Sequence, residues 1–334
     1  MDKRLNPASP TAPHIIDARQ FSRDWIEGTL FPLALDLQET PVGDLPRTLL
    51  GKRLFYLFYE PSTRTRISFE TAVALLGGAA AGMEHHELLP EDESLEDRIR
   101  VINQYGYDFI LLRYHEQGGA QRAAAVSQTP IISGGDGQGQ HPTQALLDTY
   151  TIWRELGRLD DFKVALVGDL SYERTTNSLA SLLPRFQNVT LYFVSPHLLR
   201  IGVPLRTYLE QNRVRFHEVR DLRTIVDEVD VLYITRAHSE RLEHARRFEN
   251  PSPPYALDAD LMARLPAHAT VLHPLPRGPE LPPDFDSDPR IACFRQTRNG
   301  LFIRMALLCL LATTKDEDQS LSGPHRRRSS ARGR

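Results

Sequence analysis

One short segment of the chain concentrates side chains that could bind an anion. Residues 61–66 read PSTRTR and stand directly before an amphipathic run. A helix that begins there offers unpaired backbone N–H groups and the positive end of its dipole, and anions bind at such ends. Ser62, Thr63 and Thr65 add hydroxyl donors. Arg64 adds a charged fork suited to phosphate. The segment therefore predicts a phosphate site, although a plain helix cap with solvated arginines would use similar residues.

Two other segments place polar side chains where predicted elements end or begin. Arg113 lies at the end of the apolar run YDFILLRY, and its charge points to the same sheet edge as residues 61–66. His141 and Gln144 begin the pattern HPTQALLDTYTIWRELG and share one helical face. A surface arginine and a helix cap with a buried histidine would explain these residues equally well.

A proline-rich segment follows another predicted strand. Residues 273–277 read HPLPR and come after the apolar run ATVL. The two prolines remove two N–H donors and fix the backbone, which leaves rigid carbonyl groups available as acceptors. The other interpretation is a stiff loop without a binding role. No glycine-rich Walker loop or dinucleotide fingerprint accompanies these segments.

The elements that must position these side chains alternate along the chain. Apolar, β-rich runs and longer helical patterns follow one another, which is typical of an α/β protein with parallel sheets. The predicted strands cover residues 53–59, 107–114, 129–135, 162–170, 188–196, 213–219, 229–236 and 270–276. The predicted helices cover residues 68–78, 120–128, 141–157, 178–186 and 301–314, the last apolar on nearly all sides. Gly157 suits the C-terminal cap of the long helix.

The same patterns suggest a division into domains. We expect one domain over residues 21–150 and a second over 151–295. A C-terminal helix over residues 296–314 is expected to pack back on the first domain. Residues 1–20 and the arginine-rich residues 315–334 are expected to be disordered tails, because they carry too little apolar surface to offset the entropy of ordering.

Composition narrows the class of protein further. The chain has 334 residues, a net charge of -3 and 41% hydrophobic residues, as expected of a globular protein of two domains. It contains no signal-peptide pattern and no apolar run long enough to cross a bilayer. We therefore expect no membrane and no nucleic-acid partner. The two cysteines suit a reducing cytoplasm. Glu84 and Glu87 flank His85 and His86, but these four residues do not have the spacing of a metal-binding motif. No metal is therefore predicted.

Taken together, STRTR, HPTQ and HPLPR resemble the aspartate/ornithine carbamoyltransferase family in order and spacing, over residues 21–314. Within the family the chain is most similar to the catalytic chains of the aspartate branch. VALVGDLSYERTTNSLA, YITRAHSER and QTRNGLFIRMALL carry that similarity. HPLPR also stands where the ornithine branch has a cysteine-containing HCLP.

The resemblance implies an α/β fold of two domains with the active-site cleft between them, and it implies an activity. The first domain would bind carbamoyl phosphate and the second L-aspartate, giving N-carbamoyl-L-aspartate and phosphate in pyrimidine biosynthesis. It also implies a cytoplasmic homotrimer with shared active sites, no cofactor, and a possible regulatory or dihydroorotase partner chain.

The resemblance also assigns site residues. Those that would bind carbamoyl phosphate are Ser62, Thr63, Arg64, Thr65, Arg113, His141, Gln144, Leu275 and Pro276. The catalytic ones among them, which would polarise the carbamoyl oxygen, are Thr65, Arg113 and His141. Those that would bind aspartate are Arg174, Arg236 and His238. Glu60 and Arg241 would bridge the domains.

One loop departs from the family pattern. The aspartate branch carries a serine and a lysine after its first helix, whereas Glu87 and Glu91 fall near those positions here. Seven acidic residues lie between residues 84 and 97. Carboxylates near a phosphate dianion would repel it. His238 stands where the branch usually has a glutamine, but it can still donate a hydrogen bond.

Three hypotheses follow from this departure. The chain is an aspartate carbamoyltransferase in which another basic group replaces the lysine. Alternatively, it is a carbamoyltransferase for another amino acid. The third possibility is a catalytically impaired or non-catalytic paralogue that keeps the fold.

Overall fold

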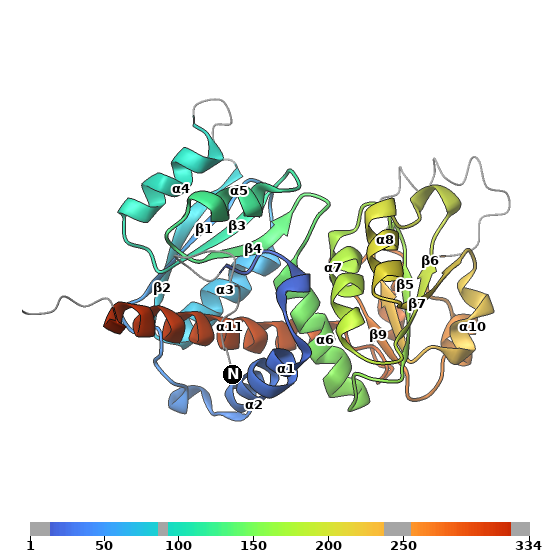
Figure 1. Cartoon of the computed structure of the whole chain (residues 1–334). Coiled ribbons are helices and arrows are strands. Elements are labelled where there is room, and N and C mark those ends of the chain that lie inside the picture. The colour runs from blue at the N-terminus through green and yellow to red at the C-terminus, as the bar shows by residue number, and fades with distance from the viewer. Residues whose placement is uncertain (1–13, 86–92, 237–254, 322–334) are drawn as a thin grey trace, which may run out of the picture.

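The computed structural model describes residues 14–85, 93–236 and 255–321 (Figure 1). Within them, two sheets of parallel strands lie side by side, each flanked by helices. The first has the order β2-β1-β3-β4, with β1 (Arg53–Phe58), β2 (Ala79–Glu84), β3 (Phe109–Tyr114) and β4 (Ile131–Asp136). The second has the order β7-β6-β5-β8-β9, with β5 (Lys163–Val167), β6 (Thr190–Val194), β7 (Arg215–Val219), β8 (Val231–Ile234) and β9 (Thr270–Leu272). The predicted α/β fold of two parallel-sheet domains is confirmed.

The helices follow the strands in the expected alternation. The α-helices are α1 (Arg23–Trp25), α2 (Phe31–Glu39), α3 (Thr63–Leu75), α4 (Leu95–Gln104), α5 (Gly119–Val126), α6 (Pro142–Leu156), α7 (Arg174–Leu182), α8 (Val203–Gln211), α10 (Ala259–Arg264) and α11 (Cys293–Leu321). A π-helix, η2 (Ile26–Leu30), joins α1 to α2. Short 3-10 turns are η1 (Ala18–Gln20), η3 (Val42–Asp44), η5 (Leu183–Arg185), η6 (His197–Leu199), η7 (Leu222–Thr224), η8 (Val226–Glu228) and η9 (Pro283–Phe285). Gly157 ends α6 in the left-handed conformation, with φ 71°, as the sequence predicted.

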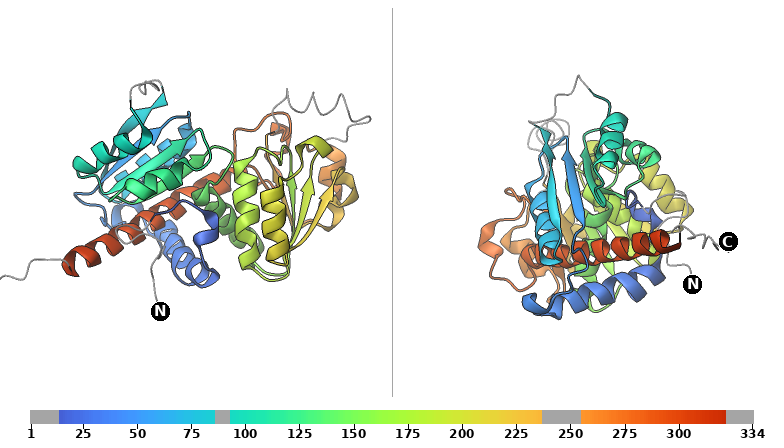
Figure 2. Two further views of the ribbon diagram at one scale, coloured as in Figure 1. Left: turned by 45° about the horizontal axis from the view of Figure 1, so that its top comes forward. Right: turned by 90° about the vertical axis from the view of Figure 1, so that its left-hand side faces the viewer.

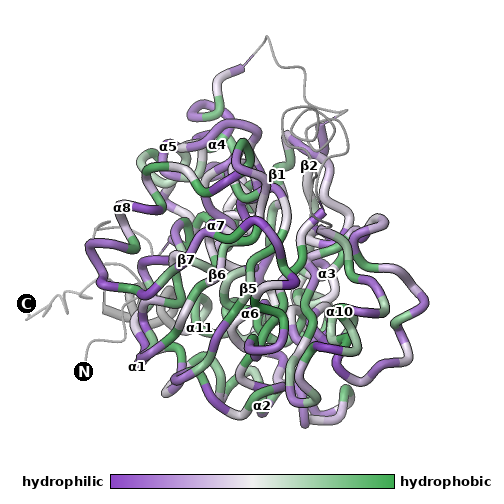
Figure 3. The backbone as a smooth tube through the Cα atoms, turned by 90° about the vertical axis from the view of Figure 1, so that its right-hand side faces the viewer, coloured by the Kyte–Doolittle hydropathy of each residue, from purple (hydrophilic) through white to green (hydrophobic). Residues whose placement is uncertain are grey.

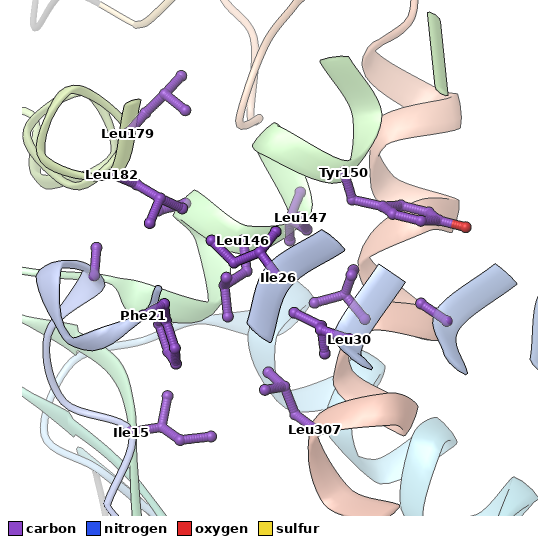
Figure 4. Close-up of a cluster of buried hydrophobic side chains, with 14 of the residues drawn as sticks. Ile15, Phe21, Ile26, Leu30, Leu146, Leu147, Tyr150, Leu179, Leu182 and Leu307 are labelled. Atoms are coloured by element: carbon purple, nitrogen blue, oxygen red, sulfur yellow. The ribbon is translucent and has the colours of Figure 1, made fainter. Parts of the chain in front are cut away.

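Helix α6 lies at the junction of the two sheets and is buried along most of its length. The boundary expected near residue 150 falls inside this helix, so the domain limits stay predictions. Leu146 and Leu147 of α6 pack with Leu179 of α7, Leu307 of α11 and Ile26 of η2 in one cluster (Figure 4). Burying apolar side chains of this size stabilises a fold by about 1.5–3 kcal/mol each. One continuous core therefore ties the helices of both domains together.

Helix α11 runs against α2, α3 and α6, and Figure 2 shows it crossing the molecule beside α2. Its described middle part is almost wholly buried, from Ile303 to Ala312, which explains its nearly all-apolar sequence. Coloured by hydropathy, the chain is hydrophobic mainly along its interior elements and hydrophilic along many outer connections (Figure 3). None of the described helices is long and apolar enough to cross a membrane.

The N-terminal tail is shorter than the sequence suggested. Ile15 is fully buried and its backbone bonds to the edge of β4, through Ile15 N to Ile131 O at 2.8 Å and Ser133 N to Ile15 O at 2.7 Å. Asp17 and Gln20 form a capping box around η1. The expectation of disorder through residue 20 is therefore wrong for residues 14–20, because two isoleucines follow the polar tail. Residues 1–13 lie outside the described residues.

Two other expectations need correction. The start of the loop expected after the first helix is strand as far as Glu84, because β2 pairs with β1 along its whole length. Alanine and glycine have low strand propensity, so the sequence carried little signal for β2. Helix α11 continues to Leu321 rather than ending at residue 314, so part of the expected basic tail is helical. Residues 322–334 lie outside the described residues.

Gly82 should be required where β2 pairs with β1. A Cβ at this position would lie 2.1 Å from the Tyr56 carbonyl oxygen. We expect Gly82→Ala to lower the free energy of unfolding by about 1–3 kcal/mol, because one chain must shift to make room. Chemical denaturation of both proteins measures the loss. Gly28→Ala is the matched control, since a Cβ there would meet nothing within 4 Å. Equal effects of the two substitutions would contradict the prediction.

His14 should make the protein less stable in acid. Burial lowers the pKa of His14 to about 4, and its Nδ1 accepts from Ile131 N at 3.0 Å. The unfolded chain, with a histidine pKa of about 6.5, binds this proton more readily, so stability falls as the pH drops from about 6.5 toward 4.

We expect His14→Asn, which keeps an acceptor but does not titrate, to lose less stability than the wild type between about pH 7 and about pH 5. The difference should be about 1–2 kcal/mol by urea denaturation. His115→Asn, at a partly exposed position, controls for the substitution itself. Parallel pH profiles for wild type and His14→Asn would contradict the expectation.

Candidate functional site

The segments singled out in the sequence meet in one cleft of about 480 Å³ between the two sheets. The predicted site residues that line it are Ser62, Thr63, Arg64, Thr65, Arg113, His141, Gln144, Arg174, Arg236, Leu275 and Pro276. Glu60 forms ion pairs with two of these residues, Arg113 and Arg174. His238 and Arg241 lie outside the described residues. Among the described residues, the structure thus brings the predicted site residues together.

The first wall of the cleft is the start of α3, directly after β1. Ser62 is the N-cap residue, but its side chain makes no capping hydrogen bond. Its hydroxyl instead donates to Thr65 Oγ1 at 2.9 Å. The backbone N–H groups of the first turn are therefore not satisfied by this side chain, and they point where an anion would bind. This geometry favours the phosphate-site interpretation over a plain helix cap.

Three of the arginines that line the cleft make hydrogen bonds within the site. Arg64 Nη2 donates to the Leu275 carbonyl at 2.6 Å, which links α3 to the loop after β9. Arg113 Nη1 donates to Gly134 O at 2.9 Å, and Arg174 Nη1 donates to Gly137 O at 2.8 Å. Burial, followed by repulsion from Arg174, lowers the pKa of Arg113 to about 10. Burial also lowers the pKa of Arg64.

Glu60 supplies the negative charge that faces these arginines. Its Oε2 lies 3.0 Å from Arg174 Nη2 and 3.4 Å from Arg113 Nη2. The pair with Arg174 joins the end of β1 to the start of α7, and so joins the two domains. The sequence predicted Glu60 as a bridging residue but not this partner.

His141 is the N-cap residue of α6 and is 4% exposed. Burial lowers its pKa well below the usual range, and the nearby Arg113, Arg304 and Arg174 lower it further. The imidazole is therefore neutral. Thr143 Oγ1 lies 3.4 Å from Nδ1, so a tautomer protonated at Nε2 can accept from this hydroxyl and donate elsewhere. Ser178 Oγ accepts from the His141 backbone N–H at 2.7 Å and fixes its position.

The loop after β9 forms the opposite wall. Leu275 N donates to His273 Nδ1 at 2.8 Å, so His273 Nε2 carries the proton that faces Glu280 Oε1 at 3.0 Å. The Leu275–Pro276 peptide bond is cis. The loop is thus held from within by a buried histidine. Its two prolines restrict the same stretch of backbone.

Sequence reasoning missed a group of buried polar residues under the cleft. Asp148 lies one turn after Gln144 on α6 and is fully buried. Gln296 and Arg304 come from α11 and also line the cleft. Burial raises the pKa of Asp148 to about 7, while hydrogen bonds from Gln296, Tyr233 and Gln144 and the charge of Arg304 act in the opposite direction. A charge on an otherwise apolar helical face was the available signal for Asp148 and Arg304.

No group of three or more histidine, cysteine, aspartate or glutamate residues in the described part of the chain could hold a metal ion. The cleft instead offers hydroxyl, guanidinium, imidazole and amide groups around a helix start. The fold and this site define a two-domain α/β protein with an anion-binding cleft between its sheets.

Comparison with known proteins identifies the family. The model of the carbamoyl-phosphate-binding domain of aspartate/ornithine carbamoyltransferases matches residues 13–154. The model of the Asp/Orn-binding domain matches residues 160–311. The chain therefore belongs to the aspartate/ornithine carbamoyltransferase family, and it is a transferase.

Individual relatives agree with this assignment. The chain is 45% identical to the chloroplastic aspartate carbamoyltransferase of Oryza sativa, over 89% of this chain and 84% of the relative. The catalytic subunit of Methanocaldococcus jannaschii aspartate transcarbamoylase is 40% identical, with a TM-score of 0.82 over 91% of this chain and 99% of that chain. The Trypanosoma cruzi aspartate transcarbamoylase in complex with carbamoyl phosphate and aspartate is 36% identical, with a TM-score of 0.83 over 92% and 99% of the two chains.

Gly135 should be needed for the arginines to occupy the cleft. Its φ is +125°, and a Cβ would lie 2.8 Å from Arg113 Nη1. We expect Gly135→Ala to displace the guanidinium and weaken the binding of inorganic phosphate about tenfold, measured by isothermal titration calorimetry. Gly51→Ala shares the left-handed backbone, with φ +78°, but meets nothing within 4 Å. The prediction is wrong if both variants bind phosphate like the wild type.

Proposed function

We propose that this protein is an aspartate carbamoyltransferase. It transfers the carbamoyl group of carbamoyl phosphate to the amine of L-aspartate and releases N-carbamoyl-L-aspartate and phosphate. The observation that carries the proposal is the convergence of the α3 start, Arg113, His141, Gln144 and the loop at Leu275 on one cleft. The relatives named above support the same activity.

Carbamoyl phosphate would bind against α3. Its phosphate would take hydrogen bonds from the first-turn N–H groups, from the hydroxyls of Ser62 and Thr63, and from Arg64. Its carbamoyl oxygen would accept from Thr65, Arg113 and His141. Its nitrogen would donate to Gln144 and to the backbone carbonyls near Leu275 and Pro276. In these contacts His141 is neutral, as described above.

The chemistry follows from the charges. The neutral amine of aspartate attacks the carbamoyl carbon, and negative charge develops on the carbamoyl oxygen of a tetrahedral intermediate. Donors aimed at such an oxygen contribute about 3–4 kcal/mol each. Phosphate then leaves and takes up the proton that the amine loses. A neutral His141 suits this role, because it donates without holding a charge that burial would penalise.

Aspartate would bind on the side of the second domain. Arg174 and Arg236 line that side of the cleft and would hold the two carboxylates. Glu60 neutralises part of the positive charge of Arg174. A bound substrate carboxylate would share this guanidinium group with Glu60. His238 and Arg241 are proposed to help from residues outside those described.

The acidic segment obstructs this function less than its sequence suggested. Four of its seven acidic residues belong to the described part of the chain, and each pairs with an arginine. The pairs are Glu84 with Arg66 at 3.0 Å, Glu93 with Arg98 at 3.2 Å, Glu96 with Arg122 at 2.7 Å and Asp97 with Arg100 at 2.7 Å. Pairing cancels most of the field that these carboxylates would exert on a phosphate. Glu87 and Glu91 lie outside the described residues.

The two alternatives find less support. The relatives and structures above are named as aspartate carbamoyltransferases, which favours aspartate over another amino acid and activity over a non-catalytic role. We further propose a homotrimer with shared active sites that acts in pyrimidine biosynthesis in the cytoplasm, with a possible regulatory or dihydroorotase partner chain. The rice relative is named as chloroplastic, so cell fractionation should test the compartment.

The proposed activity should depend on Arg64. With carbamoyl phosphate and L-aspartate, the wild type should form equal amounts of ureido product and phosphate. Arg64→Ala should lower kcat/KM by about a thousandfold, because one charged donor is lost from the site. Arg206→Ala removes an arginine of the second domain that pairs with Glu218, and it should leave the rate unchanged. Ornithine and diaminopropionate complete the amine panel. Product from one of these amines but not from aspartate, or no product at all, would overturn the proposal.

A further inference from the structure

Asp148 lies below the cleft, where three neighbours donate hydrogen bonds to its carboxylate. Gln144 Nε2 donates to Oδ1 at 2.8 Å, and Gln296 Nε2 donates to the same oxygen at 2.6 Å. Tyr233 OH donates to Oδ2 at 2.8 Å. Asp148 and Tyr233 are fully buried, and Gln296 is 2% exposed. The carboxylate thus joins α6, α11 and β8 at the base of the cleft.

The hydrogen bonds of Gln296 settle which way its amide points. Its Oε1 accepts from the backbone N–H of His273 at 2.9 Å, and a backbone N–H can act only as a donor. The amide nitrogen must therefore face Asp148. Asp148 Oδ1 therefore accepts the hydrogen bond from Gln296. Any other amide that contacts this oxygen must also donate to it.

Gln144 shares that oxygen and must also turn its nitrogen toward Asp148. Its own oxygen, Oε1, is thereby left for the cleft, which Gln144 lines. The same carboxylate, acting through Gln296, holds His273 at the start of the loop that carries Leu275 O. Gln144 Oε1 lies on one side of this subsite and Leu275 O on the other. Both are acceptors, and neither group presents an N–H donor to the subsite.

From this we infer that Asp148 is a positioning residue that makes the cleft select a substrate carrying an NH₂ group. It would do so by fixing the amides of Gln144 and Gln296 so that acceptors face the carbamoyl nitrogen. The inference rests on the proposed function for the identity of the substrate. A methyl group in place of NH₂, as in an acetyl phosphate, would leave these buried acceptors without a partner, and such mismatches are strongly rejected.

Arg304 completes the arrangement by favouring the charged form of the carboxylate, against the effect of burial. It lies on the same helix as Gln296, is 6% exposed and interacts electrostatically with Asp148. Its Nε makes no hydrogen bond within the described residues. The titratable groups that act on Asp148 are Arg304 from α11 and, from β8, Tyr233, whose phenol is neutral. Asp148 Oδ1 accepts from both amides, so each glutamine has one orientation in the structure.

The test compares two phosphonates that do not react. Phosphonoacetamide carries an NH₂ group beside its carbonyl, and 2-oxopropylphosphonate carries a methyl group at the same place. Isothermal titration calorimetry with the full chain gives the ratio of their dissociation constants. We expect the wild type to prefer the amide by about tenfold or more. In Asp148→Asn the amide of Gln144 can turn over, whereas Gln296 stays fixed by the His273 backbone N–H, and the preference should fall to within about threefold.

Two further variants separate positioning from general damage. Tyr233→Phe removes the third donor to Asp148 but leaves both amides bound, so the preference for the amide should persist. Gln144→Met keeps Asp148 but removes the acceptor, so the preference should be lost. Thermal unfolding of each variant records its stability. If Asp148→Asn does not fold, Asp148→Ser takes its place.

The outcomes are distinct from those of the activity assay. An undiminished preference in the Asp148 variant, or an equal loss in Tyr233→Phe, overturns the inference while the proposed activity stands. A wild type that prefers the amide but does not form ureido product refutes the proposed activity and leaves the inference supported. A wild type without any preference overturns the inference.

Discussion

The structure depends on holding several positive guanidinium groups around one cleft despite their mutual repulsion. Burial lowers the pKa of Arg113, and repulsion between Arg113 and Arg174 lowers it further. Glu60 lies between them and offsets part of this repulsion. A bound phosphate dianion would relieve the rest, so the cleft is built for an anion in its charge as well as in its shape.

This constraint explains how the rest of the molecule is arranged. The guanidinium groups come from different sheets, so both sheets must be held in place. Helix α6 provides the link, since it carries His141 and Gln144 toward the cleft while its apolar face joins the common core. Helix α11 packs along α6 and places Gln296 and Arg304 beneath the same cleft. Packing and site chemistry therefore use the same two helices.

Outside the cleft, the described carboxylates of the acidic segment form ion pairs with arginines. The acidic segment reads as a strong negative field in the sequence, yet its described members each face an arginine. Arg66 and Arg122 come from other elements than the carboxylates they meet. Within the cleft, the buried Asp148 is compensated by three hydrogen bonds and by Arg304. Glu60, Asp148 and the described members of the acidic segment thus each have a local partner, which helps to preserve the positive potential that an anionic substrate needs.

The sequence by itself determined the α/β class and pointed to several of the cleft residues, because apolar periodicity and short polar segments are local properties. Residues such as Ser62, Arg113 and His141 could be found from their neighbours alone. Only the tertiary structure decided which groups meet. Strand β2 arises from pairing with β1 rather than from its own propensity, residues 14–20 are ordered by the edge of β4, and the partners of Glu60, Glu84 and Asp148 come from distant elements. Such contacts depend on long-range packing, which no local pattern specifies.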